Sequence, residues 1–115
     1  MIKKENLINF EKKIVKEYND SKIRYPVHLS SGTESFLINI FKKIKRKDWV
    51  FTNWRSHYHL LLKTQDEKLS YKLIKRGSSM YPCSKKHKVF GSAIVGGIIP
   101  IALGVALSIK LKKQK

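Results

Sequence analysis

The sequence predicts a single, mostly helical domain of the α/β class. Two observations carry this prediction. Apolar residues recur at three- and four-residue steps in the first part of the chain, and a Gly-rich turn leads into an apolar segment near the carboxyl end. A turn of this kind, followed by small and apolar residues, is typical of a buried helix in an α/β domain. With 115 residues there is room for one small domain, which argues against a large independent enzyme.

Charge and cysteine content restrict the possible partners and the compartment. Lys and Arg number 25 against 8 for Asp and Glu, so the formal net charge is +17. Such a field attracts nucleic acid, an anionic membrane surface and phosphorylated small molecules alike, and it does not choose among them. The single Cys83 excludes an internal disulfide, and charges interrupt the amino terminus before an apolar stretch of secretory-signal length develops. We therefore expect a cytoplasmic protein.

Residues 1–20 are predicted to form an amphipathic helix. Apolar residues repeat at helical spacing between Ile2 and Tyr18, with Lys and Glu between them. The apolar positions are Leu7, Ile8, Phe10, Ile14, Val15 and Tyr18. Asn19, Asp20 and Ser21 then break the helix, and Pro26 favours an extended conformation at the residue before it, so a loop should follow.

Residues 21–88 should alternate short helices with loops. A second helix is expected after the Ser30–Glu34 stretch, which offers a Ser as N-cap and an acidic residue in the first turn. Its apolar face comprises Phe36, Leu37, Ile40, Phe41 and Ile44. The run from Trp49 to Phe51 is strand-like, and residues 57–63 should be helical. The remaining elements are a short helix around Leu69, Leu73 and Ile74 and a loop between Arg76 and Lys88.

Residues 89–111 admit two interpretations. No charge occurs between Lys88 and Lys110, so length and apolarity fit a transmembrane helix of roughly 20 residues with Lys on both sides. The glycines and Pro100 equally fit a Gly-rich turn followed by a buried apolar helix with Pro near its first turn. Hydropathy alone leaves open a small basic membrane protein, anchored by this segment, as the alternative function.

Three segments with candidate chemistry occur in a fixed order. They are His-Leu-Ser-Ser-Gly-Thr-Glu at 28–34, Thr-Asn-Trp-Arg-Ser-His-Tyr-His at 52–59, and Arg-Gly-Ser-Ser-Met at 76–80, which runs on to Gly-Ser-Ala-Ile-Val-Gly-Gly at 91–97. In order and spacing they resemble the alpha subunits of pyruvate, branched-chain 2-oxo acid and acetoin dehydrogenases. That family has a His-Leu followed by Gly-Gln-Glu, then aromatic-Arg-x-His-Gly-His, then a Gly-Gly-Ser-Met-His loop before Gly-Ile-Val-Gly.

The resemblance implies a fold and a function for residues 1–115. The chain would be the amino-terminal, mostly helical part of a thiamine-diphosphate-binding domain with a Rossmann-like, parallel sheet. The complete subunit would decarboxylate a 2-oxo acid on thiamine diphosphate and transfer the acyl group to lipoamide. Its partners would be a beta subunit, in a heterotetramer, and a lipoyl-bearing acyltransferase, with no nucleic acid and no membrane. The family's Mg²⁺ ligands, from a Gly-Asp-Gly pattern and a later Asn, would lie beyond residue 115, so we expect the chain alone to be incomplete and inactive.

The resemblance also assigns roles to single residues. Arg55 would contact the cofactor's diphosphate, for which a guanidinium fork is well suited. Trp54 would pack near the same cofactor, and His57 would act as the catalytic residue, close to the diphosphate and able to move a proton near neutral pH. The backbone carbonyl of Ala93 would accept a hydrogen bond from the aminopyrimidine, and the amide of Val95 would donate one to a ring nitrogen.

Each assignment has a plainer alternative, and the sequence departs from the family pattern. Arg55 could be a solvated surface charge, Trp54 a core residue and His57 a structural histidine, and the Gly-rich run could lead into a helix without binding a ligand. The departures are Thr33 for Gln, Tyr58 for Gly, Tyr81 for His and Ala93 for Gly. The substrate therefore stays open, and the role of Ala93 requires backbone dihedrals that suit a residue with a Cβ.

Overall fold

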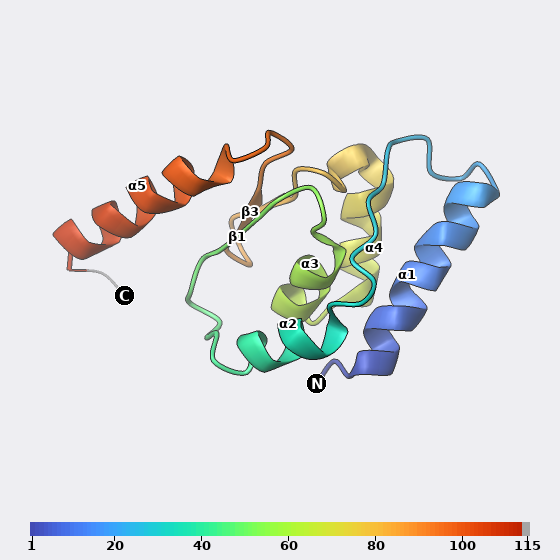
Figure 1. The fold of residues 1–115 in the computed structure, drawn as a ribbon, viewed down its shortest axis with the longest axis horizontal. Coiled ribbons are helices and arrows are strands. Elements are labelled where there is room, and N and C mark those ends of the chain that lie inside the picture. Colours follow the sequence, from blue (N-terminus) through green and yellow to red (C-terminus); the bar gives the residue numbers. More distant parts are fainter. Residues whose placement is uncertain (114–115) are drawn as a thin grey trace.

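The computed structural model describes residues 1–113 (Figure 1). Four helices pack together as a helical body: α1 (Lys4–Asn19), α2 (Glu34–Phe41), α3 (His57–Thr64) and α4 (Glu67–Leu73), which continues into the π-helical turn η1 (Ile74–Ser78). A small sheet of β1 (Val50–Thr52), β2 (Cys83–Ser84) and β3 (Val89–Gly91) lies beside this body, and helix α5 (Ile98–Leu111) extends away from it at the end opposite α1. The α/β class and the mostly helical character predicted from the sequence are confirmed.

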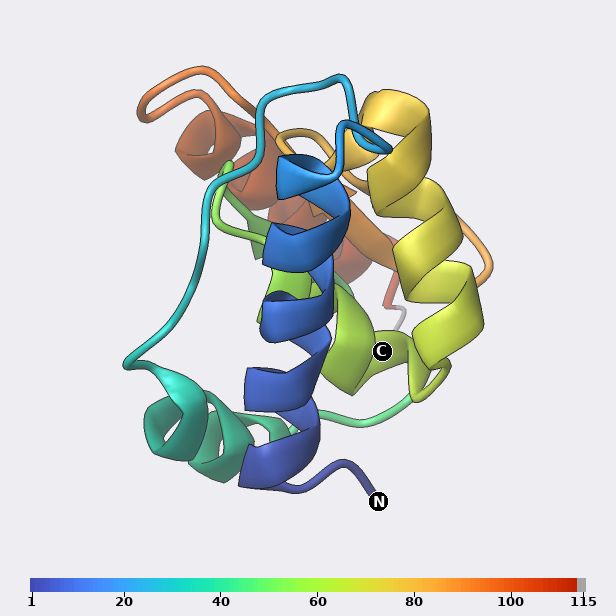
Figure 2. The same ribbon diagram turned by 90° about the vertical axis from the view of Figure 1, so that its right-hand side faces the viewer.

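Helix α3 lies at the centre of the helical body. Figure 2 shows α1 crossing in front of α3, with α4 on one side and α2 below. Five of the eight residues of α3 are buried, because neighbouring helices cover most of its circumference. The core also takes the predicted apolar face of α1, where Leu7, Phe10 and Ile14 are each at most 1% exposed. The amphipathic first helix is therefore confirmed, although Tyr18 at its end is 46% exposed.

Helix α2 differs from its prediction at both ends. It begins at Glu34, so Thr33 and not a serine occupies the N-cap position, and no side chain caps the helix. The reason is local, because the Thr33 hydroxyl donates a 2.7 Å hydrogen bond to the Ser30 carbonyl and closes a turn before the helix starts. The helix ends at Phe41, which leaves Ile44 in the following loop.

The sheet has the strand order β1-β3-β2 and is mixed. Strands β1 and β3 are parallel, in the register Val50↔Val89 to Thr52↔Gly91, and β2 pairs with β3 antiparallel. The strand-like run predicted at Trp49–Phe51 is confirmed with a shift of one residue. Two short elements were missed, since β2 lies in the predicted 76–88 loop and β3 begins where a Gly-rich turn was expected. Gly91 is required in β3, because a Cβ there would lie 2.5 Å from the Pro82 side chain.

Helix α5 exposes the apolar surface that the sequence predicted to be buried. None of its residues is buried, and Ile99, Leu103 and Leu111 are each about 70% exposed. The prediction of a buried helix is thus wrong for the described residues, because they provide no further layer on which α5 could pack. Pro100 does fall in the first turn, as predicted. Among residues 1–113, no helix is both long enough and apolar enough to span a membrane, and α5 has 14 residues where the transmembrane interpretation required roughly 20.

Candidate cofactor-binding site

The parallel pairing of β1 and β3 brings two of the predicted cofactor segments to one edge of the sheet. Thr52 and Gly91, the last residues of the two strands, are register partners, and the Ser92 amide donates a 3.1 Å hydrogen bond to the Thr52 carbonyl. The Asn53–Arg55 segment and the Ser92–Val95 segment therefore leave the sheet side by side. In open α/β sheets, ligands bind outside the carboxyl ends of parallel strands.

Arg55 lies at the start of one of these segments and is exposed. Its amide donates to the Asn53 side chain at 2.9 Å, which fixes a tight turn after β1. Its guanidinium Nη1 donates to the Leu29 carbonyl at 2.7 Å, so the side chain is held against the His28–Glu34 segment. A guanidinium has further N–H donors, and those left over on an exposed side chain are free for oxygens of a ligand. Trp54, beside it, is half-buried.

Ala93 and Val95 provide backbone groups at the same edge. Neither the Ala93 carbonyl nor the Val95 amide has a hydrogen-bond partner among residues 1–113, and the Val95 side chain is 81% exposed. Ala93 does not have a positive φ, so its Cβ is compatible with the backbone at this position. The replacement of glycine by Ala93 therefore leaves the predicted backbone contact possible.

His57 is placed differently from the other candidates, because its ring has no exposed surface. Its Nδ1 lies 3.1 Å from the Glu11 carboxylate and its Nε2 lies 2.6 Å from the Ser79 hydroxyl. The neighbouring Ser56 hydroxyl donates to the Ser79 carbonyl at 2.6 Å. These contacts give His57 a positioning role, since they fasten the Ser-Met loop to the start of α3. Its catalytic role stays a prediction.

Glu11 and Glu34 are buried carboxylates that hold the turn at residues 30–34, just before α2. The Ser30 amide donates to Glu11 at 2.6 Å, and Glu34 accepts hydrogen bonds from the Gly32 amide and the Tyr58 hydroxyl, both at 2.9 Å. The Gly32 N–H, as the largest cause, holds the pKa of Glu34 below its usual value. Burial, followed by the hydrogen bond to Glu34, strongly raises the pKa of the Tyr58 hydroxyl. Tyr58, the departure from the family's glycine, is thus a core residue that anchors this loop.

The exposed guanidinium of Arg55 is the group at this edge whose chemistry suits an anionic ligand. The Thr52 hydroxyl, three residues before Arg55, is buried at the end of β1 without a hydrogen-bond partner, which is unusual for a buried polar group. Within residues 1–113, no group of three or more His, Cys, Asp or Glu side chains could hold a metal ion.

A comparison with protein families shows to which family the chain belongs. The family model described as "Dehydrogenase E1 component" matches residues 3–115, which is nearly the whole chain. The chain belongs to the dehydrogenase E1 component family. The resemblance drawn from the three segments is therefore confirmed at the level of the family.

Two curated relatives of this E1 chain are alpha subunits. The pyruvate dehydrogenase E1 component subunit alpha-3 of Arabidopsis thaliana, described as chloroplastic, is 28% identical over 92% of this chain. The corresponding alpha subunit of Porphyra purpurea is 29% identical over the same share. The match covers 27% and 34% of these relatives, so the E1 chain spans only about a third of their length or less. No solved structure matches it.

The sequence alone missed three contributors to the site of this E1 chain. Ser79 belongs to the Ser-Met motif, but its partnership with His57 was not predicted. Glu11 could have been found, because it lies within the buried face of α1, next to Phe10 and one turn from Ile14. The carbonyl of Leu29 gives no signal in a sequence, since any residue can supply it.

Proposed function

We propose that this chain forms the amino-terminal part of an alpha subunit that decarboxylates a 2-oxo acid on thiamine diphosphate and passes the acyl group to lipoamide. The observation that carries the proposal is the parallel register of β1 and β3, which gathers the Arg55 segment and the Ala93–Val95 segment at one strand edge. Membership of the E1 family supports it, and both relatives are named as pyruvate dehydrogenase subunits.

In this proposal the described residues bind and orient the cofactor. Arg55 holds the diphosphate through guanidinium donors that Leu29 does not use, and Trp54 packs against the ligand. The Ala93 carbonyl and the Val95 amide fix the aminopyrimidine. When bound, thiamine diphosphate supplies the carbanion chemistry of decarboxylation. His57 keeps the Ser79 loop in place and is the candidate for moving a proton.

The proposal extends to partners and location. A beta subunit would complete the site in a heterotetramer, and a lipoyl-bearing acyltransferase would accept the acyl group. Mg²⁺ would accompany the diphosphate, and within residues 1–113 no group of three or more His, Cys, Asp or Glu side chains could hold it. We propose a cytoplasmic location, which the single cysteine supports.

The proposal is tested in a chimeric subunit. In the alpha subunit of Porphyra purpurea, the matched segment is replaced by this chain, and thiamine-diphosphate-dependent decarboxylation is assayed with the cognate beta subunit. We expect activity, and we expect Arg55→Gln to raise the cofactor concentration for half-maximal rate about tenfold or more, because hydrogen bonds to charged groups contribute about 1.5–3 kcal/mol.

Arg24→Gln is the matched control. Arg24 is exposed in the loop after α1, and its substitution removes the same charge as Arg55→Gln. An equal effect of both substitutions would assign the loss to general charge and contradict the proposed role of Arg55. The 115-residue chain alone is expected to be inactive. Tight, Mg²⁺-dependent cofactor binding by that chain would contradict the expectation that it is incomplete.

A further inference from the structure

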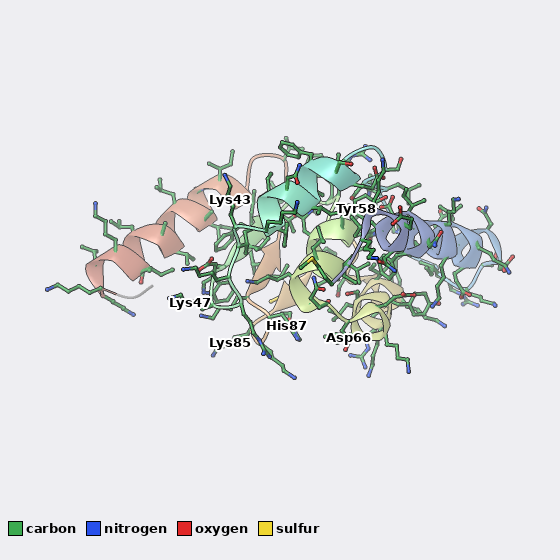
Figure 3. All side chains as sticks on the ribbon, turned by 90° about the horizontal axis from the view of Figure 1, so that it is seen from below. Lys43, Lys47, Tyr58, Asp66, Lys85 and His87 are labelled. Atoms are coloured by element: carbon green, nitrogen blue, oxygen red, sulfur yellow. The ribbon has the colours of Figure 1, made fainter. Side chains whose placement is uncertain are left out.

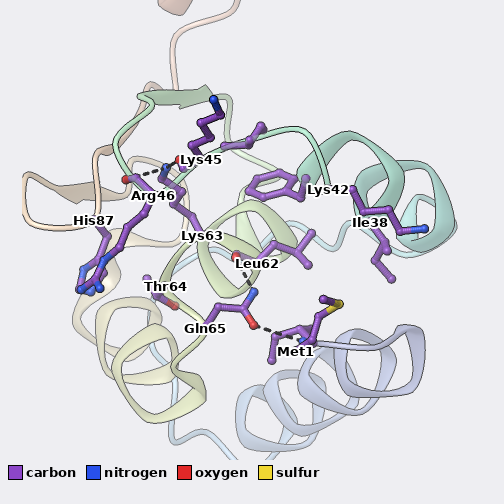
Figure 4. Close-up of a pocket in the computed structure, with 13 residues that line it drawn as sticks. Met1, Ile38, Lys42, Lys45, Arg46, Leu62, Lys63, Thr64, Gln65 and His87 are labelled. Carbon is purple, nitrogen blue, oxygen red and sulfur yellow. Dashed lines mark hydrogen bonds between the residues drawn. The ribbon is translucent and has the colours of Figure 1, made fainter. Parts of the chain in front are cut away.

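A cavity of about 590 Å³ is lined by residues that precede β1 and β3 in the chain and by none from the cofactor edge (Figure 4). It is formed by the amino-terminal Met1 and Ile2, the end of α2, the loop that leads to β1, and the end of α3. Its floor is apolar and consists of Ile38, Phe41, Ile44 and Leu62. Cavities of this size and apolarity bind small molecules in many proteins.

The rim of the cavity is basic. Lys42, Lys45 and Arg46 line it, together with Lys63, and no Asp or Glu does so among the described residues. Lys63 is fixed in place, because its ammonium donates to the carbonyls of Lys45 and Asp48 at 2.8 and 2.6 Å. These hydrogen bonds fix the loop that contains Lys45 and Arg46. Figure 3 shows further basic side chains, Lys47 and Lys85, in the same part of the molecule.

The uncharged polar side chains of the lining already have hydrogen-bond partners within the protein. Gln65 accepts from the Ile2 amide at 3.2 Å and donates to the Leu62 carbonyl at 2.7 Å (Figure 4). The Thr64 hydroxyl is 2.9 Å from the Ser70 hydroxyl. Burial, followed by the charges of Lys86 and Arg46, lowers the pKa of His87, so this residue of the lining is neutral at pH 7. The floor therefore offers few free hydrogen-bonding groups for the polar edges of a base or a sugar. An alkyl chain requires no hydrogen-bonding groups.

We propose that this cavity binds a single alkyl chain that ends in a carboxylate, with the chain on the apolar floor and the carboxylate at the rim formed by Lys42, Lys45 and Arg46. Charge complementarity selects the anionic head, and the apolar floor selects the chain. The site shares no lining residue with the cofactor edge, so it does not depend on the proposed dehydrogenase function.

The test uses decanoate, below its micelle concentration, and isothermal titration calorimetry on the unmodified 115-residue chain. We expect a dissociation constant on the order of 0.1–1 mM. Octanoate is two methylenes shorter and should bind up to about sixteenfold more weakly, because each buried methylene contributes up to about fourfold. Decanol should also bind more weakly than decanoate, since it lacks the charge. Equal affinity for octanoate and decanoate would overturn the proposal and would indicate only general attraction of anions to a chain of net charge +17.

A matched pair of variants locates the site. Ile44→Glu places an acid on the floor and should weaken decanoate binding more than tenfold. Ile40→Glu makes the same change at a 39% exposed position of α2 outside the cavity, and it should leave affinity within about twofold. Equal losses in both variants would overturn the proposal. The comparison of octanoate with decanoate needs no variant, so it tests the proposal even if Ile44→Glu does not fold.

Helix α5 presents a second apolar surface, which must be separated from the cavity. The double variant Leu103→Gln, Leu107→Gln removes two exposed leucines from α5, which are 68% and 54% exposed. It is expected to bind decanoate as tightly as the unmodified chain. Loss of binding in this variant would assign the ligand to α5 and overturn the proposal.

Discussion

Helices α3 and α5 are both rich in apolar residues, but only α3 has its apolar residues buried. Five of the eight residues of α3 are buried, and none of the fourteen in α5 is. The helices α1, α2 and α4 surround α3, whereas α5 is in contact with little beyond β1. Apolar composition therefore predicts where a helix forms, but burial depends on whether another surface covers it.

The largest effect should come from truncating one leucine in each of these helices. Leu61→Ala in α3 removes a side chain that is 1% exposed and should lower the free energy of unfolding by about 2–5 kcal/mol. Leu103→Ala in α5 removes a side chain that is 68% exposed and should change the free energy of unfolding by less than about 0.5 kcal/mol. Urea unfolding followed by circular dichroism measures both. Similar losses in the two variants would show that α5 is buried in solution.

The buried hydrogen-bond network should give the next largest effect. His57→Ala leaves the Glu11 carboxylate and the Ser79 hydroxyl without their ring partner, which should cost about 2–4 kcal/mol of unfolding free energy. His87→Ala, at a half-buried position next to Ser84, is the control and should cost less than about 1 kcal/mol. Thermal and urea unfolding compare the two. A small loss at His57 would show that water takes over its contacts.

The sequence predicted more of the helical body than of the sheet or the site. The face of α1 was predictable because Leu7, Phe10 and Ile14 repeat at helical spacing over about two turns. Strands β2 and β3 span two and three residues, too short for any periodicity, and their pairing depends on contacts between distant parts of the chain. The resemblance predicted Arg55 and His57 as site residues, but it did not predict the burial of His57, which follows from packing against α1.

Tyr58 gives a smaller effect that tests how the helical body holds the His28–Glu34 segment. Tyr58→Phe keeps the buried ring and removes only the hydroxyl that donates to Glu34, so it should cost about 1 kcal/mol. Tyr71→Phe removes a hydroxyl that donates to Glu17 at the half-buried surface, and its cost should be lower. The free energies of unfolding in urea at pH 7 provide the comparison. A larger loss at Tyr71 would mean that burial does not decide the strength of these two bonds.

The smallest expected effect is a change in how stability depends on pH. The Gly32 N–H and the Tyr58 hydroxyl lower the pKa of Glu34 in the folded chain from its ordinary value of 4.5, so its carboxylate contributes stability that is fully present above that value and is lost as pH falls through the lowered pKa. Glu34→Gln keeps an acceptor oxygen for both donors but cannot titrate. The loss of unfolding free energy as pH falls from about 5, above the ordinary value, to about 3 should therefore become shallower. It should not vanish, because the hydrogen bond from Tyr71 also lowers the pKa of Glu17. Glu5→Gln, at an exposed position of α1, is the control, and an identical change in slope for both variants would show that net charge and not the buried contact of Glu34 sets the acid sensitivity.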